Sequence, residues 1–115
     1  MLLAGLAACN KSSDTSPSPI VVTNTITITS NGASPQNIQI ALGSRVKFVN
    51  NDNRSRNMTS DPHPDHTDCP ELNQVGFLTP GQERETGNLN TVKTCGFHDH
   101  DDSGNAKLKG SIKIQ

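Results

Sequence analysis

All four histidines and two of the three cysteines of this 115-residue chain lie in two short segments. The residues are His63, His66 and Cys69 in the first segment, and Cys95, His98 and His100 in the second. Imidazole and thiolate groups bind copper and zinc, whereas carboxylates and carbonyls suit calcium and magnesium. One histidine beside prolines is usually an ordinary loop residue, but four histidines beside two cysteines favour a metal site. The sequence therefore predicts a copper site, with zinc as the alternative metal.

The sequence shows no catalytic machinery. Its serines lie mostly in turns and in a Ser/Pro-rich segment, and no nucleophile, base and orienting group stand in an evident set. The net charge of −1 gives no electrostatic basis for binding nucleic acid. We therefore expect a binding protein that is not an enzyme and has no nucleic-acid partner.

The N-terminal residues resemble the end of a bacterial export signal. Residues 1–8 read MLLAGLAA, and the segment LAAC (6–9) resembles the lipobox at which the cysteine of a lipoprotein is acylated. Residues 1–8 are shorter than a full signal peptide, so we interpret them as a remnant whose start lies upstream. Residues 9–19 would be the lipidated Cys9 and a polar tether that its composition predicts to be disordered. The expected location is the bacterial cell envelope, on its periplasmic or outer face, with Cys9 anchored in the membrane.

Lipidation of Cys9 would leave two cysteines, Cys69 and Cys95. An exported protein is in an oxidising compartment, where two thiols form a disulfide or bind a metal. The core also needs such support, because the chain has no tryptophan, no tyrosine and only three phenylalanines. Both uses of the cysteines stay open at this point.

The elements that must position these residues are short β-strands. Ile26 and Ile28 alternate with threonines, and residues 38–42, 46–48 and 112–114 show the same period of two. Residues 75–78 are a short apolar segment, residues 83–91 resemble a polar edge strand, and residues 92–97 lead into the second histidine segment. Turn residues such as Asn31-Gly32 separate these strands, and no window has a helical apolar period. Residues 20–115 are therefore predicted to form an all-β sandwich.

The order of these features resembles the cupredoxin family, of the plastocyanin and azurin type. Residues 34–51 are similar to the family pattern P-x-x-I-x-V-x-x-G-x-x-V-x-F-x-N, and residues 78–82 are similar to its L-x-P-G turn. Residues 95–98 (CGFH) and 108–114 (LKGSIKI) are similar to its C-x-x-H and M-x-G-x-V-x-V ending. The resemblance implies a cupredoxin-like Greek-key β-sandwich of about seven to eight strands.

The chain departs from the family at the expected copper ligands. A blue-copper site holds copper by two histidines and one cysteine thiolate, with a weak axial methionine. The resemblance places Arg56 where the family has its first histidine, and a guanidinium does not bind copper. It places Leu108, which has no donor atom, at the axial position, so that only Cys95 and His98 match the family's ligands.

Two arrangements can replace the family's site. In the first, Cys95 remains a thiolate, and His63 or His66 supplies the missing imidazole. In the second, which we favour, Cys69 and Cys95 form a disulfide, and some of His63, His66, His98 and His100 hold the metal.

Residues 99–105, after Cys95, are rich in acidic side chains. They resemble half of a calcium-binding loop but are better explained as a solvated loop.

Three functions follow from these arrangements. The first is an envelope-anchored copper-binding protein that transfers electrons through a modified site to a redox partner protein. The second is a copper- or zinc-handling protein with a histidine site and no redox role. The third is a metal-free, disulfide-stabilised module with a structural or interaction role, since a fold does not fix a function.

Overall fold

The computed structural model describes residues 19–115. The predicted signal remnant, the lipidation site Cys9 and the predicted tether up to residue 18 lie outside the described residues. Within residues 19–115, no helix is long and apolar enough to span a membrane.

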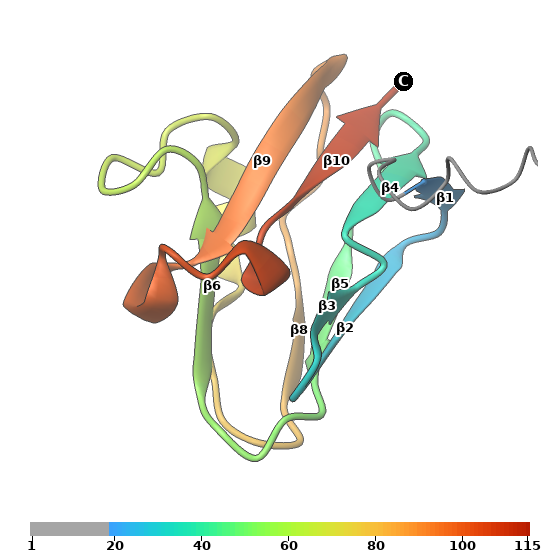
Figure 1. The fold of residues 1–115 in the computed structure, drawn as a ribbon. Helices are drawn as coiled ribbons and strands as arrows, with labels where there is room; N and C mark the ends of the chain where they lie inside the picture. The colour runs from blue at the N-terminus through green and yellow to red at the C-terminus, as the bar shows by residue number, and fades with distance from the viewer. Residues whose placement is uncertain (1–18) are drawn as a thin grey trace, which may run out of the picture.

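Two β-sheets pack against each other to form the sandwich (Figure 1). The first sheet has the strand order β1 (Ile20–Val22), β4 (Asn37–Ile40), β10 (Gly110–Ile114), β9 (Lys93–Asp99), β6 (Arg56–Ser60) and β7 (Gly76–Leu78). The second has the order β3 (Gly32–Ser34), β2 (Thr25–Thr29), β5 (Lys47–Asn50) and β8 (Glu83–Glu85). Three short 3-10 helices complete the described chain: η2 (Pro70–Gln74), η3 (His100–Asp102) and η4 (Ala106–Leu108). Most neighbours within a sheet are not consecutive in the sequence, as a Greek-key sandwich requires.

The alternating residues of the strands fill the space between the sheets. Ile26 and Ile28 of β2 are fully buried, whereas the threonines that alternate with them are partly exposed. Phe48 of β5 and Phe97 of β9 meet edge to face, with their ring centroids 5.3 Å apart, and so join the two sheets. Edge-to-face aromatic pairs stabilise a fold by more than the burial of their surface area alone provides. The predicted all-β sandwich is confirmed.

The described residues form ten strands, more than the sequence predicted. The strand missed most clearly is β6, because its buried positions are Arg56, Met58 and Ser60, a pattern that does not alternate apolar with polar residues. The predicted inward residue Leu42 is half-exposed, since β4 ends at Ile40.

The pairing of β6 with β9 determines where the two histidine segments meet. These strands are antiparallel, and Thr59 lies opposite His98. The segment that follows β6, residues 61–69, folds back along β9, where the Asp61 N–H donates to the carbonyl of Gly96. Phe97 points between the sheets, so its neighbour His98 points to the opposite, outer face of β9, which the 61–69 segment covers.

Candidate metal centre

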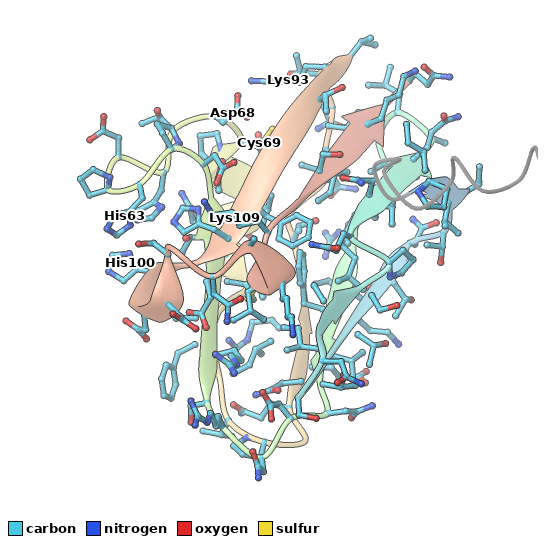
Figure 2. All side chains as sticks on the ribbon, in the orientation of Figure 1. His63, Asp68, Cys69, Lys93, His100 and Lys109 are labelled. Atoms are coloured by element: carbon cyan, nitrogen blue, oxygen red, sulfur yellow. A yellow bond between two sulfur atoms is a disulfide. The ribbon has the colours of Figure 1, made fainter. Side chains whose placement is uncertain are left out.

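The four predicted histidines lie together on the outer face of β9. One ring nitrogen from each of His63, His66 and His98 lies within 4.8 Å of the other two. The fourth, His100, has its Nδ1 atom 2.9 Å from the Nε2 atom of His66, and its ring centroid is 5.0 Å from that of His63. In Figure 2, His63 and His100 lie side by side, between the 61–69 segment and η3. The structure thus brings both predicted segments to one site.

His98 is held by an aspartate that its own strand does not supply. The Nδ1 atom of His98 lies 2.6 Å from Asp61 Oδ1. Because an ionised carboxylate only accepts hydrogen bonds, Nδ1 carries the hydrogen and donates a hydrogen bond to Asp61. The Nε2 atom of His98 is then left with its lone pair, near the hydroxyl of Thr59 at 3.4 Å. A carboxylate on the far nitrogen of a metal-binding histidine fixes its tautomer and makes it a better ligand.

His66 is held in the same way by a backbone carbonyl. Its Nδ1 atom donates to the carbonyl oxygen of Ser60 at 2.8 Å, so that Nε2 carries the lone pair and can accept a hydrogen bond or bind a metal. The side chain of Asn73 donates to the His66 carbonyl at 2.8 Å and holds the backbone at a positive φ of 54°. The 2.9 Å between His66 Nε2 and His100 Nδ1 is close to the spacing of two adjacent ligands, each about 2.0 Å from one ion.

His63 is exposed and adjoins the other three histidines. Partial desolvation lowers the pKa of His63 below its usual value, and the nearby positive forms of His100, His98 and His66 lower it further. The neutral imidazole, which is the form that binds a metal, is therefore favoured at neutral pH.

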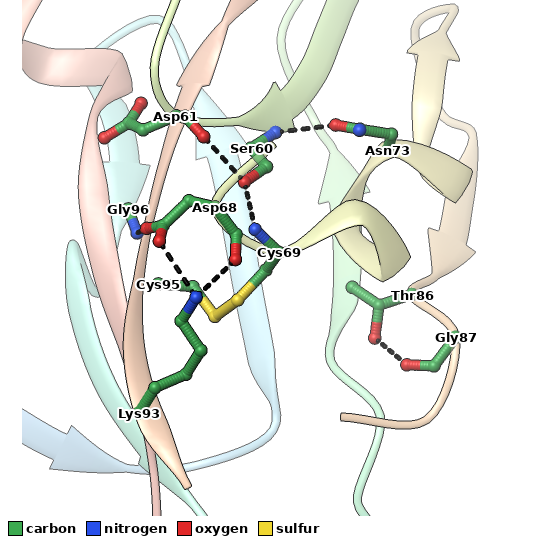
Figure 3. The surroundings of a disulfide bond; sticks show 10 residues. All are labelled: Ser60, Asp61, Asp68, Cys69, Asn73, Thr86, Gly87, Lys93, Cys95 and Gly96. Carbon is green, nitrogen blue, oxygen red and sulfur yellow. Dashed lines mark hydrogen bonds and ion pairs between the residues drawn. A yellow bond between two sulfur atoms is a disulfide. The ribbon is translucent and has the colours of Figure 1, made fainter. Parts of the chain in front are cut away.

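Cys69 and Cys95 are joined in a disulfide, which confirms the disulfide that the sequence favoured (Figure 3). Their Cα atoms are 5.8 Å apart, and both side chains are buried. The Cys69 N–H also donates to the Ser60 hydroxyl at 2.7 Å, so the end of the 61–69 segment is tied to β6 as well as to β9. The other arrangement, in which Cys95 is a thiolate ligand, is not the one found, because its sulfur is bonded to Cys69.

Asp68 fastens the same segment to β9 beside the disulfide (Figure 3). Its Oδ2 atom accepts the Gly96 N–H at 3.0 Å, and its Oδ1 atom lies 3.1 Å from the Lys93 ammonium. The Gly96 N–H, with help from Lys93, lowers the pKa of Asp68 although burial opposes the shift. Asp68 therefore stays ionised and keeps both contacts at neutral pH.

A side chain at position 96 would not fit, because the 61–69 segment lies directly on Gly96. A Cβ atom added at Gly96 would lie only 2.0 Å from Oδ2 of Asp61, the carboxylate that holds His98. The glycine in the Cys-Gly-Phe-His sequence is thus needed for the close approach of the His63 and His66 segment to β9.

The positions that the family resemblance assigned to the remaining copper ligands have other roles. Arg56 is almost fully buried, and its Nη2 atom lies 2.9 Å from Asp52 while its Nη1 atom lies 3.2 Å from Asp99. Hydrogen bonding to Arg56 lowers the pKa of Asp52. Leu108, expected at the axial position, is a buried core residue. The residues present therefore fit a metal held by imidazole nitrogens, and they do not fit a blue-copper thiolate site.

Sequence reasoning missed the groups that orient the histidines. The acidic run 99–105, expected to be solvated, pairs with Arg56 through Asp99 and, at 3.7 Å, through Asp102. Asp99 also accepts the N–H groups of Asn57 and Asp101, which fastens the start of η3, where His100 lies, to β6. Charge balance could have indicated this pairing, because a buried arginine such as Arg56 needs acidic partners and the run 99–105 supplies them.

Solved structures with similar folds are cupredoxins. A purple cupredoxin from Nitrosopumilus maritimus superimposes with a TM-score of 0.63 and 16% identity, over 81% of this chain and 100% of that chain. The oxidised plastocyanin of Dryopteris crassirhizoma gives a TM-score of 0.61 and 17% identity, over 79% of this chain and 99% of that chain. A mutant amicyanin in its Cu(I) form gives 0.61 and 11% identity, over 83% and 82%. No family model and no curated protein matches the sequence.

Proposed function

Because this chain has the cupredoxin fold, we propose that it is a copper-binding protein whose metal is held by imidazole nitrogens alone. The observation that carries the proposal is the convergence of His63, His66 and His98, whose ligand nitrogens lie within 4.8 Å of one another. His100 would be the fourth ligand. Some of the solved proteins of similar fold have copper in their descriptions, which favours this metal.

The ligand chemistry favours copper(II) over zinc. Affinity for a site of nitrogen ligands rises along the first-row metals to a maximum at Cu²⁺ and falls again at Zn²⁺. Ser60 and Asp61 set the tautomers of His66 and His98. These two side chains therefore already have the tautomer and ring orientation that metal binding requires.

The disulfide determines the kind of copper protein that we propose. Without a free thiolate, the site lacks the ligand that gives blue-copper centres their intense colour and tuned potential. We propose that the protein holds or hands over copper ions, and that it is neither an enzyme nor an electron carrier of the blue-copper type.

The test is a titration of the protein with Cu(II) and with Zn(II), followed by absorption and electron paramagnetic resonance. We expect one ion per chain, weak visible absorption, nitrogen hyperfine structure and tighter binding of copper than of zinc. His98→Ala should weaken copper binding more than about 100-fold, beyond the effect usual for a lost outer-shell partner. Thr67→Ala is the control, because Thr67 is exposed in the 61–69 segment, next to His66, and its side chain forms no hydrogen bond within residues 19–115.

The same titration separates the alternatives. An intense visible band would require Cys95 as a thiolate ligand and would overturn the nitrogen site. Tighter binding of zinc would make the protein a zinc-handling one. Binding of neither metal at micromolar concentration would favour the metal-free interaction module.

We also propose that the protein is anchored in the bacterial cell envelope through Cys9, because LAAC is followed by a polar tether. Expressed behind a complete export signal, the protein should fractionate with membranes, and Cys9→Ser should release it. Equal membrane association of the two proteins would refute the anchor.

A further inference from the structure

A solvent-open pocket adjoins the histidine cluster. Its volume is about 240 Å³, enough for several atoms in addition to a water molecule. The residues that line it are Asp61, Pro62, His63, His98, Ser103 and Lys109. Two of these are ligands of the proposed metal, so a small molecule in the pocket would lie beside the ion.

The charges around the pocket favour a negative occupant. Lys109 is exposed, and among residues 19–115 no acidic group forms an ion pair with it. The one carboxylate in the lining, Asp61, is already engaged with His98 at 2.6 Å. Ser103 adds a hydroxyl that can donate a hydrogen bond. Within residues 19–115, the side chains of Lys109 and Ser103 have no hydrogen-bond or ion-pair partner, so both are available as donors at the pocket.

The proposed metal would increase this preference. Imidazole ligands are neutral, so four of them leave the two positive charges of a copper(II) ion uncompensated, and a bound cation is often the largest local charge in a site. Asp61, the one carboxylate that lines the pocket, balances only part of that charge.

We propose that this pocket is a binding site for a small anion, of the carboxylate or inorganic type, which completes the coordination of the metal. This proposal rests on the proposed copper site. The anion lies between the metal and Lys109, and Ser103 donates a hydrogen bond to it. The residues that recognise the anion are thus supplied by the segment between η3 and β10, and the metal ligands by the 61–69 segment and β9.

The test uses azide as the probe, because azide bound to copper(II) produces its own charge-transfer absorption. Copper affinity is measured first, in a buffer without coordinating anions, for wild type, Lys109→Gln and the control Lys107→Gln. The control removes the same charge from the neighbouring helix η4, and Lys107 does not line the pocket. Azide is then titrated into each copper-loaded protein.

Wild type should develop the azide band, and Lys109→Gln should weaken azide binding roughly 3- to 10-fold, the effect of losing one partly solvated charge pair. The same variant should leave copper affinity unchanged or raise it, because a cation near the metal is removed. A merely structural role of Lys109 would lower both affinities together.

Failure of wild type to bind copper would overturn both proposals. Copper binding without an azide band, or equal weakening of azide by Lys109→Gln and Lys107→Gln, would overturn the anion site alone and leave the copper site standing.

Discussion

Replacing one cysteine of the Cys69–Cys95 disulfide should destabilise the protein strongly. The bond links residues 26 positions apart, and the loop-closure relation assigns a loop of that length about 3.5 kcal/mol of unfolded-state entropy at 25 °C. A small domain is stable by only about 5–15 kcal/mol. Cys69→Ala or Cys95→Ala should thus remove a large part of the free energy of unfolding, and lower the melting temperature by roughly 14–28 °C.

The two single variants and the double variant should behave alike, because each removes the same bond. The measurement is urea unfolding of the metal-free protein, with and without reductant. Wild type in reductant should approach the variants, and the variants themselves should not respond to reductant. Because the variants lack the disulfide, their response to reductant measures the effect of the reductant itself, which can then be subtracted from the response of wild type.

Metal binding extends the test. The disulfide fastens the end of the segment that carries His63 and His66, so copper affinity should fall to a similar extent in Cys69→Ala and Cys95→Ala without being abolished. A destabilisation below about 1 kcal/mol in either variant, well outside the usual effect of a native disulfide, would refute the reasoning. Loss of copper binding in Cys95→Ala alone would show instead that Cys95 is a ligand.

Three further outcomes are expected. Arg56→Met should lower the free energy of unfolding by about 3–5 kcal/mol, measured by urea denaturation, because two buried carboxylates lose their partner. The pKa of Asp68 is lowered by the Gly96 N–H, so its stabilisation is present above the unfolded value of 3.8 and is lost as the pH falls through the folded value; Asp68→Asn should flatten that acid limb in a pH series. Gly96→Ala should weaken copper binding at least about 10-fold by displacing Asp61 from His98, whereas Gly104→Ala, where an added Cβ meets no atom within 4 Å, should not.

The chemistry and the architecture could be predicted from the sequence because both depend on local information. The period of two at Ile26 and Ile28 is a property of neighbouring residues, and it indicates a half-buried strand wherever the chain folds. The types of donor atom in the two histidine segments likewise restrict the metals that they suit. Two cysteines in a chain with a weak core and a predicted export signal were enough to favour a disulfide.

The arrangement of the site was decided by contacts between distant residues. Nothing near Arg56 in the sequence indicates that it lies on a strand, since the residues buried with it do not follow the apolar alternation. Its partner Asp99 is 43 positions away, and only the antiparallel register of β6 with β9 brings the two together. The same register places Asp61 against His98, and so selects which nitrogen of that histidine can bind a metal.

The sequence by itself determined which atoms could bind a metal and that they would be presented by a β-sandwich. Only the tertiary structure decided that the histidines would gather on the outer face of β9, that Cys95 would bond to Cys69, and that an arginine would hold η3 in place. The physical reason is that residue types and local periodicity are encoded along the chain. Strand register, burial and the partner of each charged group depend instead on the whole fold.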